Sequence, residues 1–305
     1  MICGASKKLR IAIIGGCQVS GLGAAVRQLL PEAEVKSWHV GVHPKDSDDD
    51  LLVKLRGFDA VISQISDWDT HVALRITRLR DMRLPVIYLP VLVFSGFHPD
   101  CTYLRGPSGL IAGLGSDYHS TIVAAAFVLG VSEKRVPELF NSYIFAELGY
   151  FEVFEVAKEA LISNFEKEGF NLRPYFDCWL KVVGKFMYTI NHPHIFALAT
   201  LSTLVLKMAG YIDASVLTPT GIDDYLSTHT IWPLYPSLAK RLNILGETTF
   251  MRQEYGLAVD QSRLMTLQEY TSGIYRLYEN LPAQYLRTVD VIKVCERLEL
   301  LGLRA

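Results

Sequence analysis

Short apolar runs alternate with helical patterns over the first third of the chain. Residues 10–16 (RIAIIGG) have the pattern of a buried strand, and the other segments that predict strands are residues 33–40 (AEVKSWHV), 58–66 (FDAVISQIS) and 84–94 (LPVIYLPVLVF). Helical spacing separates them at residues 22–30, 51–55 and 71–82. Strands that alternate with helices in this way predict βαβ units and a parallel sheet.

The pattern becomes mostly helical after about residue 116. Helical spacing recurs at residues 117–130, 136–148, 151–169, 178–190, 194–210, 261–281 and 288–302. The first of these helices is expected to begin at an N-cap, Asp117. We therefore predict an α/β fold, with a parallel sheet and flanking helices in residues 1–116. Residues 117–305 are predicted to form a mainly helical region packed on the sheet in one compact body.

Charge and cysteine content narrow the function classes. The formal net charge of the 305 residues is −2, so no global charge steers the protein toward nucleic acid or an anionic membrane. The five cysteines form no CxxC pair or zinc-type spacing. Scattered cysteines favour a reducing compartment, and we expect free thiols in a cytoplasmic protein.

No segment has the pattern of a membrane span. The longest apolar stretch, residues 195–211, is broken by polar residues and falls short of the ~18–20 apolar residues needed to cross a bilayer. Residues 11–14 are far shorter than the about 7–15 residues of a signal-peptide core. Peripheral contact with a membrane is compatible with this pattern.

Polar residues follow three of the predicted strands. Gly16, Cys17 and Gln18 come after the first strand, Gln64 after the third and Ser95 after the fourth. Ligands bind at the carboxyl ends of parallel strands. A helix N-terminus directly after Cys17 would lower the pKa of its thiol, and nearby amides would stabilise an oxyanion. A small buried cysteine at a tight turn fits the position equally well.

A cysteine nucleophile needs a base, and several histidines are candidates. The NHPH segment, residues 191–194, precedes a predicted helix, and His192 is our first choice. His98 has Asp100 two positions later, and His119 follows Asp117 in the same way. These Asp–His pairs could orient an imidazole. They lack the compact spacing of known metal motifs, and we expect no metal. Signatures of dinucleotide-binding sites and P-loops are also absent.

Four segments taken together resemble the WcbI-type capsular polysaccharide biosynthesis family: IIGGCQ, VFSGFHPDCTYLRGP, GSDYHS and MYTINHPH. The resemblance implies a coenzyme A-dependent acetyltransferase whose α/β part is similar to the SGNH-hydrolase fold. Cys17 then stands in place of the hydrolase serine, and His192 with Asn191 in place of the histidine and aspartate. The oxyanion or substrate residues implied are Gly16, Gln18, Gln64 and Ser95. The residues implied to bind the coenzyme, or to support those that do, are His98, Asp100, Arg105, Tyr118 and His119.

The activity implied is acetyl transfer from acetyl-CoA to a sugar hydroxyl of a capsular polysaccharide. Either Cys17 becomes acetylated, or a histidine activates the sugar hydroxyl directly. The coenzyme phosphates need cations, for which the candidates are Arg105, Lys181, Lys185, Arg241 and Arg252. The alternatives are a thiol-type hydrolase of an ester or glycan, and a non-catalytic scaffold that binds coenzyme A or a glycan.

Overall fold

The computed structural model describes residues 8–40, 47–257 and 262–303, and the chain divides into two compact units. Unit 1 consists of residues 1–93, 160–186 and 192–226, and unit 2 consists of residues 94–159, 187–191 and 227–305. Each unit therefore takes its residues from separate parts of the sequence. The single boundary at residue 116 stays a prediction.

The sheet of unit 1 has four parallel strands in the order β2-β1-β3-β4. The strands are β1 (Arg10–Gly15), β2 (Glu34–His39), β3 (Ala60–Ser63) and β4 (Val86–Tyr88). Ile13 of β1 lies opposite Ser37 on one side and Ile62 on the other. Residues 11–14 are completely buried, as expected for a strand covered on both faces. The predicted α/β class and the parallel sheet are confirmed.

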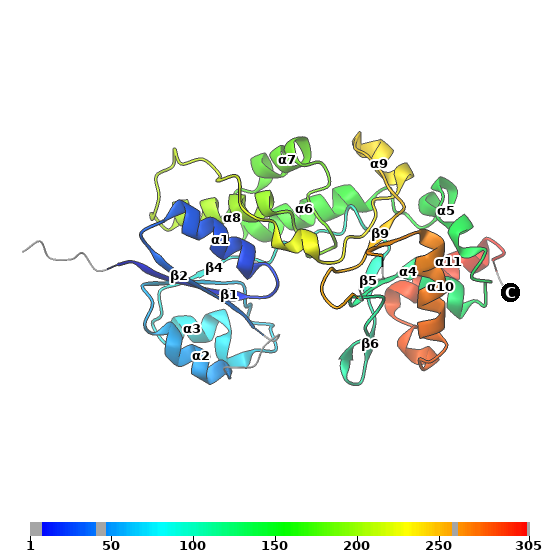
Figure 1. Cartoon of the computed structure of the whole chain (residues 1–305), viewed down its shortest axis with the longest axis horizontal. Coiled ribbons are helices and arrows are strands. Elements are labelled where there is room, and N and C mark those ends of the chain that lie inside the picture. Colours follow the sequence, from blue (N-terminus) through cyan, green and yellow to red (C-terminus); the bar gives the residue numbers. More distant parts are fainter. Residues whose placement is uncertain (1–7, 41–46, 258–261, 304–305) are drawn as a thin grey trace, which may run out of the picture. The chain divides into compact units, whose positions relative to one another are not determined.

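Helices cover both faces of this sheet. The helices of unit 1 are α1 (Val19–Leu29), α2 (Asp48–Leu55), α3 (Ile76–Asp81), α7 (Arg173–Val182), α8 (Ile195–Met208) and the 3-10 helix η1 (Val72–Leu74). Figure 1 shows α1 and α8 over one face, and α2 and α3 over the other. Apolar side chains of α2 and α3, including Leu55 and Leu79, pack with Ile14 and Val61 of the sheet. Within the described residues, every helix is too short or too polar to cross a membrane.

Helix α1 begins three residues before its predicted start at residue 22, so Gly21, which precedes the predicted helix, lies inside it together with Gly23. A Cβ on Gly21 would lie 2.5 Å from Leu198 Cδ1 of α8. A Cβ on Gly23 would lie 2.1 Å from Ser37 Oγ of β2. Both glycines are therefore positions of close packing, and placing Gly21 before the helix was wrong.

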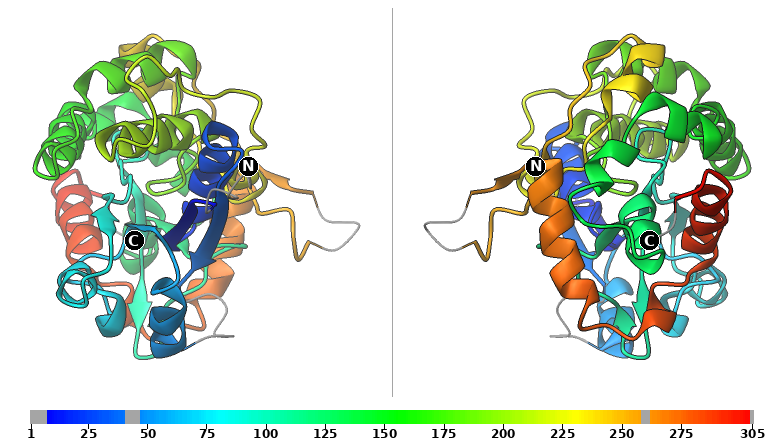
Figure 2. Two further views of the ribbon diagram at one scale, coloured as in Figure 1. Left: turned by 90° about the vertical axis from the view of Figure 1, so that its left-hand side faces the viewer. Right: turned by 90° about the vertical axis from the view of Figure 1, so that its right-hand side faces the viewer.

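Unit 2 combines helices with short antiparallel strand pairs. Its helices are α4 (Thr121–Val128), α5 (Ser142–Glu147), α9 (Pro236–Leu242), α10 (Leu267–Tyr278), α11 (Val289–Leu300), η2 (Val136–Leu139) and η4 (Ala283–Tyr285). The strand pairs are β5 (Cys101–Tyr103) with β8 (Tyr118–Ser120), β6 (Arg105–Gly106) with β7 (Gly109–Leu110), and β9 (Phe250–Met251) with β10 (Leu264–Met265). Helix α4 packs against α11 and α10, drawn in red and orange in Figure 2. Helices α6 (Val153–Glu166) and η3 (Tyr225–Thr228) belong partly to each unit.

The predicted N-cap at Asp117 is wrong. Residues 118–120 are a strand paired with residues 101–103, so the helix begins only after them. Ser120 is the N-cap of α4, and its Oγ accepts a hydrogen bond from Val123 N at 3.3 Å.

Candidate active site at the carboxyl ends of β1 and β3

The order of the strands marks a ligand site in unit 1. After β1 the chain places β2 on one side, and β3 then returns to the other side of β1. In open α/β sheets, ligands bind in the crevice at such a reversal, beyond the carboxyl ends of the two strands. The turn that follows β1 contains Gly16, Cys17 and Gln18, and the loop that follows β3 begins at Gln64.

Cys17 lies in the tight turn that joins β1 to α1. Gly16 is exposed, the Cys17 side chain is half-buried, and Val19 N donates to Gly16 O at 3.2 Å. Burial raises the pKa of the Cys17 thiol to about 11, although a backbone hydrogen bond at Cys17 itself opposes the shift. The expected lowering of this pKa by the helix N-terminus is wrong, because desolvation of the thiolate outweighs the stabilising effect of the amides. The thiol is therefore protonated at neutral pH.

Two buried glutamines connect the loops around this turn. Gln18 Nε2 donates to Leu92 O at 2.8 Å, and Gln18 Oε1 accepts from Leu92 N at 3.1 Å. Gln64 Nε2 donates to the same Gln18 Oε1 at 3.1 Å. The side-chain amides thus brace the loops after β1, β3 and β4 against one another. Their predicted part as oxyanion donors stays a prediction.

One polar atom at this place lacks a protein partner. Gln64 Oε1 is buried and accepts no hydrogen bond from the described residues. Its Nε2 is committed to Gln18, which fixes the orientation of the amide. A Cβ on Gly15 would lie only 2.9 Å from Gln64 Oε1, so the oxygen packs directly on the end of β1. A buried acceptor without a donor costs free energy, and a ligand with an N–H or O–H group would remove that cost.

The histidines of the NHPH segment differ in their surroundings. His192 is buried in unit 1, the unit that also holds Cys17. His194 is the N-cap of α8, and its Nδ1 accepts from Phe196 N at 3.1 Å. His194 Nε2 lies 3.7 Å from Asp224 Oδ2, which also accepts from Ile195 N at 2.7 Å. Burial lowers the pKa of His194, and Asp224 partly opposes that shift. Proton transfer between Cys17 and His192 stays a prediction.

Asp224 was not found by sequence analysis. It lies 30 residues after His194, and no motif connects the two positions. Only the fold brings this carboxylate to the start of α8, where it satisfies an amide of the first turn and faces the imidazole.

Asn191 belongs to unit 2, where it contacts Tyr118. The Tyr118 hydroxyl donates to Asn191 Oδ1, and Thr189 Oγ1 donates to the Tyr118 hydroxyl at 3.0 Å. The structure thus brings together two predicted site residues that are far apart in the sequence. Two others in unit 2 occupy surface or partly exposed positions: Ser95 is half-buried and Arg105 is exposed on β6.

The other predicted residues of unit 2 form a buried polar cluster. Asp100 accepts hydrogen bonds from Trp232 Nε1 at 3.1 Å and from the Tyr235 hydroxyl at 3.0 Å. Burial raises the pKa of Asp100, and hydrogen bonds from Ser120, Trp232 and Tyr235 oppose that shift. Both ring nitrogens of His98 lie 3.2 Å from backbone carbonyl oxygens.

His119 is held in one neutral tautomer by its two neighbours. Its Nε2 donates to Ile111 O at 2.9 Å, and its Nδ1 accepts from the Tyr278 hydroxyl at 3.0 Å. Burial lowers the pKa of His119. The polar atoms of Asp100, His98 and His119 therefore face protein groups, and their predicted part in coenzyme binding stays a prediction. Among the described residues, no group of three or more His, Cys, Asp or Glu side chains is arranged to hold a metal ion.

Comparison with known proteins assigns the family. The model of the family described as "Polysaccharide biosynthesis enzyme WcbI" matches residues 10–213, well over half of the chain. The protein belongs to the WcbI family of polysaccharide biosynthesis enzymes. This confirms the resemblance seen in the sequence, while the likeness to SGNH hydrolases stays a prediction.

A solved structure of WcbI has the same fold. It is similar with a TM-score of 0.66 and 14% sequence identity, over 95% of this chain and 99% of that chain. It is described as the native form of a novel polysaccharide biosynthesis enzyme without a disulfide bond between coenzyme A and one of its cysteines. No curated protein matches the chain.

Proposed function

We propose that this protein transfers an acetyl group from acetyl-CoA to a sugar hydroxyl during capsular polysaccharide biosynthesis. The observation that supports this most is the Cys17 thiol beside the reversal of strand order, next to a buried acceptor without a donor. Membership of the WcbI family and the coenzyme A named for the solved relative point to the same chemistry. A cytoplasmic location and a reaction without metal are parts of the proposal.

The residues around Cys17 suit the thiol end of coenzyme A. Its pantetheine arm carries amide N–H groups, and Gln64 Oε1 is an acceptor suited to one of them. The exposed Gly16 leaves the turn open to an incoming acyl group. The backbone amides of Gly16 and Cys17 are the proposed oxyanion donors.

The raised pKa of Cys17 makes a base necessary. With a pKa of about 11, only about one thiol in ten thousand is ionised at pH 7. In the covalent route, His192 takes the thiol proton as Sγ forms its bond to the acetyl carbon, and passes that proton to the departing coenzyme sulfur. His192 then takes the proton of the sugar hydroxyl as its oxygen bonds to the acetyl carbon, the bond between that carbon and Sγ breaks, and the proton passes to Sγ.

In the direct route, His192 takes the proton of the sugar hydroxyl, the hydroxyl oxygen attacks acetyl-CoA itself, and the coenzyme leaves as a thiol. Cys17 then only lines the site. The two routes consume the same substrates and differ in whether an acetyl-cysteine forms.

The test combines intact-protein mass with thermal stability, for wild type and Cys17→Ala. Coenzyme A is expected to raise the melting temperature of both proteins. A gain of one acetyl group in wild type alone identifies the covalent route. Stabilisation of both proteins without an adduct excludes the covalent route, and release of free coenzyme A from acetyl-CoA in the presence of a sugar acceptor then separates direct transfer from a non-catalytic scaffold. If coenzyme A stabilises neither and acetyl-CoA leaves no adduct, the proposed function is wrong, and the hydrolase and scaffold alternatives replace it.

A further inference from the structure

The loop of residues 64–71, which follows β3, presents an almost fully exposed tryptophan. The side chain of Trp68 is 93% exposed, whereas Trp179 and Trp232 are completely buried. Indole has one of the largest apolar surfaces of any side chain, and burying it would stabilise the fold. Packing therefore gives no reason for a tryptophan at this position.

Hydrogen bonds hold the loop on both sides of Trp68. Asp67 accepts from Thr77 N at 2.9 Å and from Thr77 Oγ1 at 2.5 Å, which ties the loop to α3. Asp69 O accepts from Arg75 Nε at 2.8 Å, and Asp69 Oδ1 accepts from His71 N at 3.0 Å. The indole is thus carried by a fixed backbone, so a ligand that binds there orders little additional chain.

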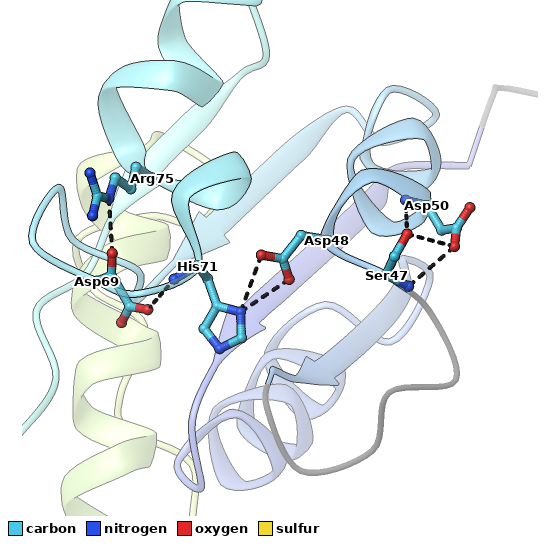
Figure 3. A network of polar contacts seen from close by, with 6 residues as sticks. All are labelled: Ser47, Asp48, Asp50, Asp69, His71 and Arg75. Atoms are coloured by element: carbon cyan, nitrogen blue, oxygen red, sulfur yellow. Dashed lines mark hydrogen bonds and ion pairs between the residues drawn. The ribbon is translucent and has the colours of Figure 1, made fainter. Parts of the chain in front are cut away.

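The end of the loop is anchored to α2, as Figure 3 shows. His71 Nδ1 lies 3.0 and 3.2 Å from the two carboxylate oxygens of Asp48. Asp48 is in the first turn of a helix with a capping box, in which Ser47 and Asp50 bond reciprocally. Because a carboxylate only accepts hydrogen bonds, Nδ1 donates to Asp48, and Nε2 is left as a second hydrogen-bonding atom of the ring.

Two polar atoms of the loop remain available to a ligand. Among the described residues, neither Asp69 Oδ2 nor His71 Nε2 has a hydrogen-bond partner. An aromatic face and hydrogen-bond acceptors match the two sides of a sugar ring, which presents an apolar C–H surface and a rim of hydroxyl donors.

The surrounding charge argues against an anionic ligand. Asp67 and Asp69 flank Trp68, and residues 48–50 add three carboxylates at the start of α2. The nearby Arg75 donates to the loop backbone. Hydrogen bonds from Thr77 lower the pKa of Asp67, and Arg80 and Arg75 add to that shift, so two cations lie near this part of the loop. The five carboxylates outnumber these two cations and disfavour phosphate groups, including those of coenzyme A and of anionic lipids. A neutral, hydroxyl-rich ligand is favoured.

We propose that the loop of residues 64–71 is a carbohydrate subsite, in which the indole of Trp68 stacks on a sugar ring and Asp69 and His71 form hydrogen bonds with its hydroxyls. The ligand is the polysaccharide acceptor, and to that extent the inference rests on the proposed function. The loop follows one of the two strands at the reversal of strand order, so it starts at the same edge of the sheet as the Cys17 turn.

The test measures binding of the full chain to an array of bacterial capsular and lipopolysaccharide glycans. Wild type, Trp68→Ala, Trp68→Phe and Leu217→Ala are compared. Leu217 is the matched control, because it is 83% exposed in the same unit. Trp68→Ala is expected to weaken binding of the preferred glycan about tenfold. Trp68→Phe keeps an aromatic face and should retain most of the affinity, and Leu217→Ala should match wild type.

The subsite is excluded if wild type binds none of the glycans, or if Trp68→Ala binds them as tightly as wild type. Stabilisation by coenzyme A, measured on the same proteins, separates this result from the acyltransferase proposal. Loss of glycan binding in Trp68→Ala with coenzyme stabilisation intact supports both proposals. If glycan binding depends on Trp68 but coenzyme A does not stabilise the protein, the subsite is supported and the acyltransferase proposal is wrong.

Discussion

The carboxyl edge of the unit 1 sheet and the buried cluster of unit 2 contain similar polar groups. They differ in whether each buried polar atom has a hydrogen-bond partner within the protein. At the edge, Gln64 Oε1 is buried without a donor and Cys17 is only half-buried. In the cluster, Asp100 and His119 are completely buried and their polar atoms face protein groups. The difference is therefore one between side chains: among the described residues, Asp100 and His119 are satisfied within unit 2, although the nearby Tyr270 hydroxyl is buried without a partner, whereas Gln64 keeps an unused acceptor at the sheet edge.

The largest effect expected is on the stability of unit 2. Asp100→Ala removes the acceptor of Trp232 Nε1 and of the Tyr235 hydroxyl, and both donors stay buried. Each unsatisfied donor costs about 1–3 kcal/mol, so the free energy of unfolding should fall by about 2–6 kcal/mol. Denaturant unfolding checks this.

Asp117→Ala is the control, because Asp117 is exposed in the same unit. Its unfolding free energy should stay within about 0.5 kcal/mol of wild type. If the two variants have equal unfolding free energies, the buried cluster does not stabilise unit 2, and the contrast drawn with the sheet edge is wrong.

A smaller effect, on binding rather than folding, is expected at the sheet edge. Gln64→Met replaces both polar atoms with a side chain of similar length, and removes the unsatisfied Oε1 together with one hydrogen bond to Gln18. These changes offset each other, so the unfolding free energy should change by less than about 1 kcal/mol. Affinity for coenzyme A, measured by calorimetry, should fall about tenfold. Unchanged affinity for coenzyme A would show that Gln64 does not contact the coenzyme.

The smallest effect expected is a change in pH dependence. The pKa of His119 lies below its usual value of 6.5 in the folded protein, so the unfolded chain binds the proton more readily. The stability from neutral His119 is present above about pH 6.5 and is lost as the pH falls below it. His119→Gln should reduce the slope of unfolding free energy against pH by at most about 1.4 kcal/mol per pH unit between pH 6.5 and 5. Identical slopes would show that His119 takes up a proton without unfolding.

Much of unit 1 could be predicted from the sequence, because β1 and β3 are continuous apolar runs closed by glycine or polar residues. The start of α1 was missed because Gly21 precedes the apolar spacing, and its close packing against Leu198 of α8 has no local signature in the sequence. The strand pairs of unit 2 are two or three residues long, too short for an alternating pattern.

The site was predictable only in part. Cys17 and Gln64 could be proposed because polar residues after buried strands meet at one edge of a parallel sheet. The pKa of Cys17 depends on burial, which the sequence does not record. Asp100 looked like a partner for His98 because they are close in sequence, yet Trp232 and Tyr235, more than 100 residues away, donate to its carboxylate.

The most direct test of the central claim is to map which cysteine reacts with the symmetrical disulfide of coenzyme A. Exchange forms a mixed disulfide with the protein and releases one coenzyme thiol. Cys178 is exposed, whereas Cys17 is half-buried and its raised pKa slows its reaction. Preferential modification of Cys17 therefore requires that coenzyme A binds beside it. We predict that coenzyme A disulfide modifies Cys17 first and that glutathione disulfide modifies Cys178 first. If both reagents modify Cys178 first, the Cys17 turn is not the coenzyme site.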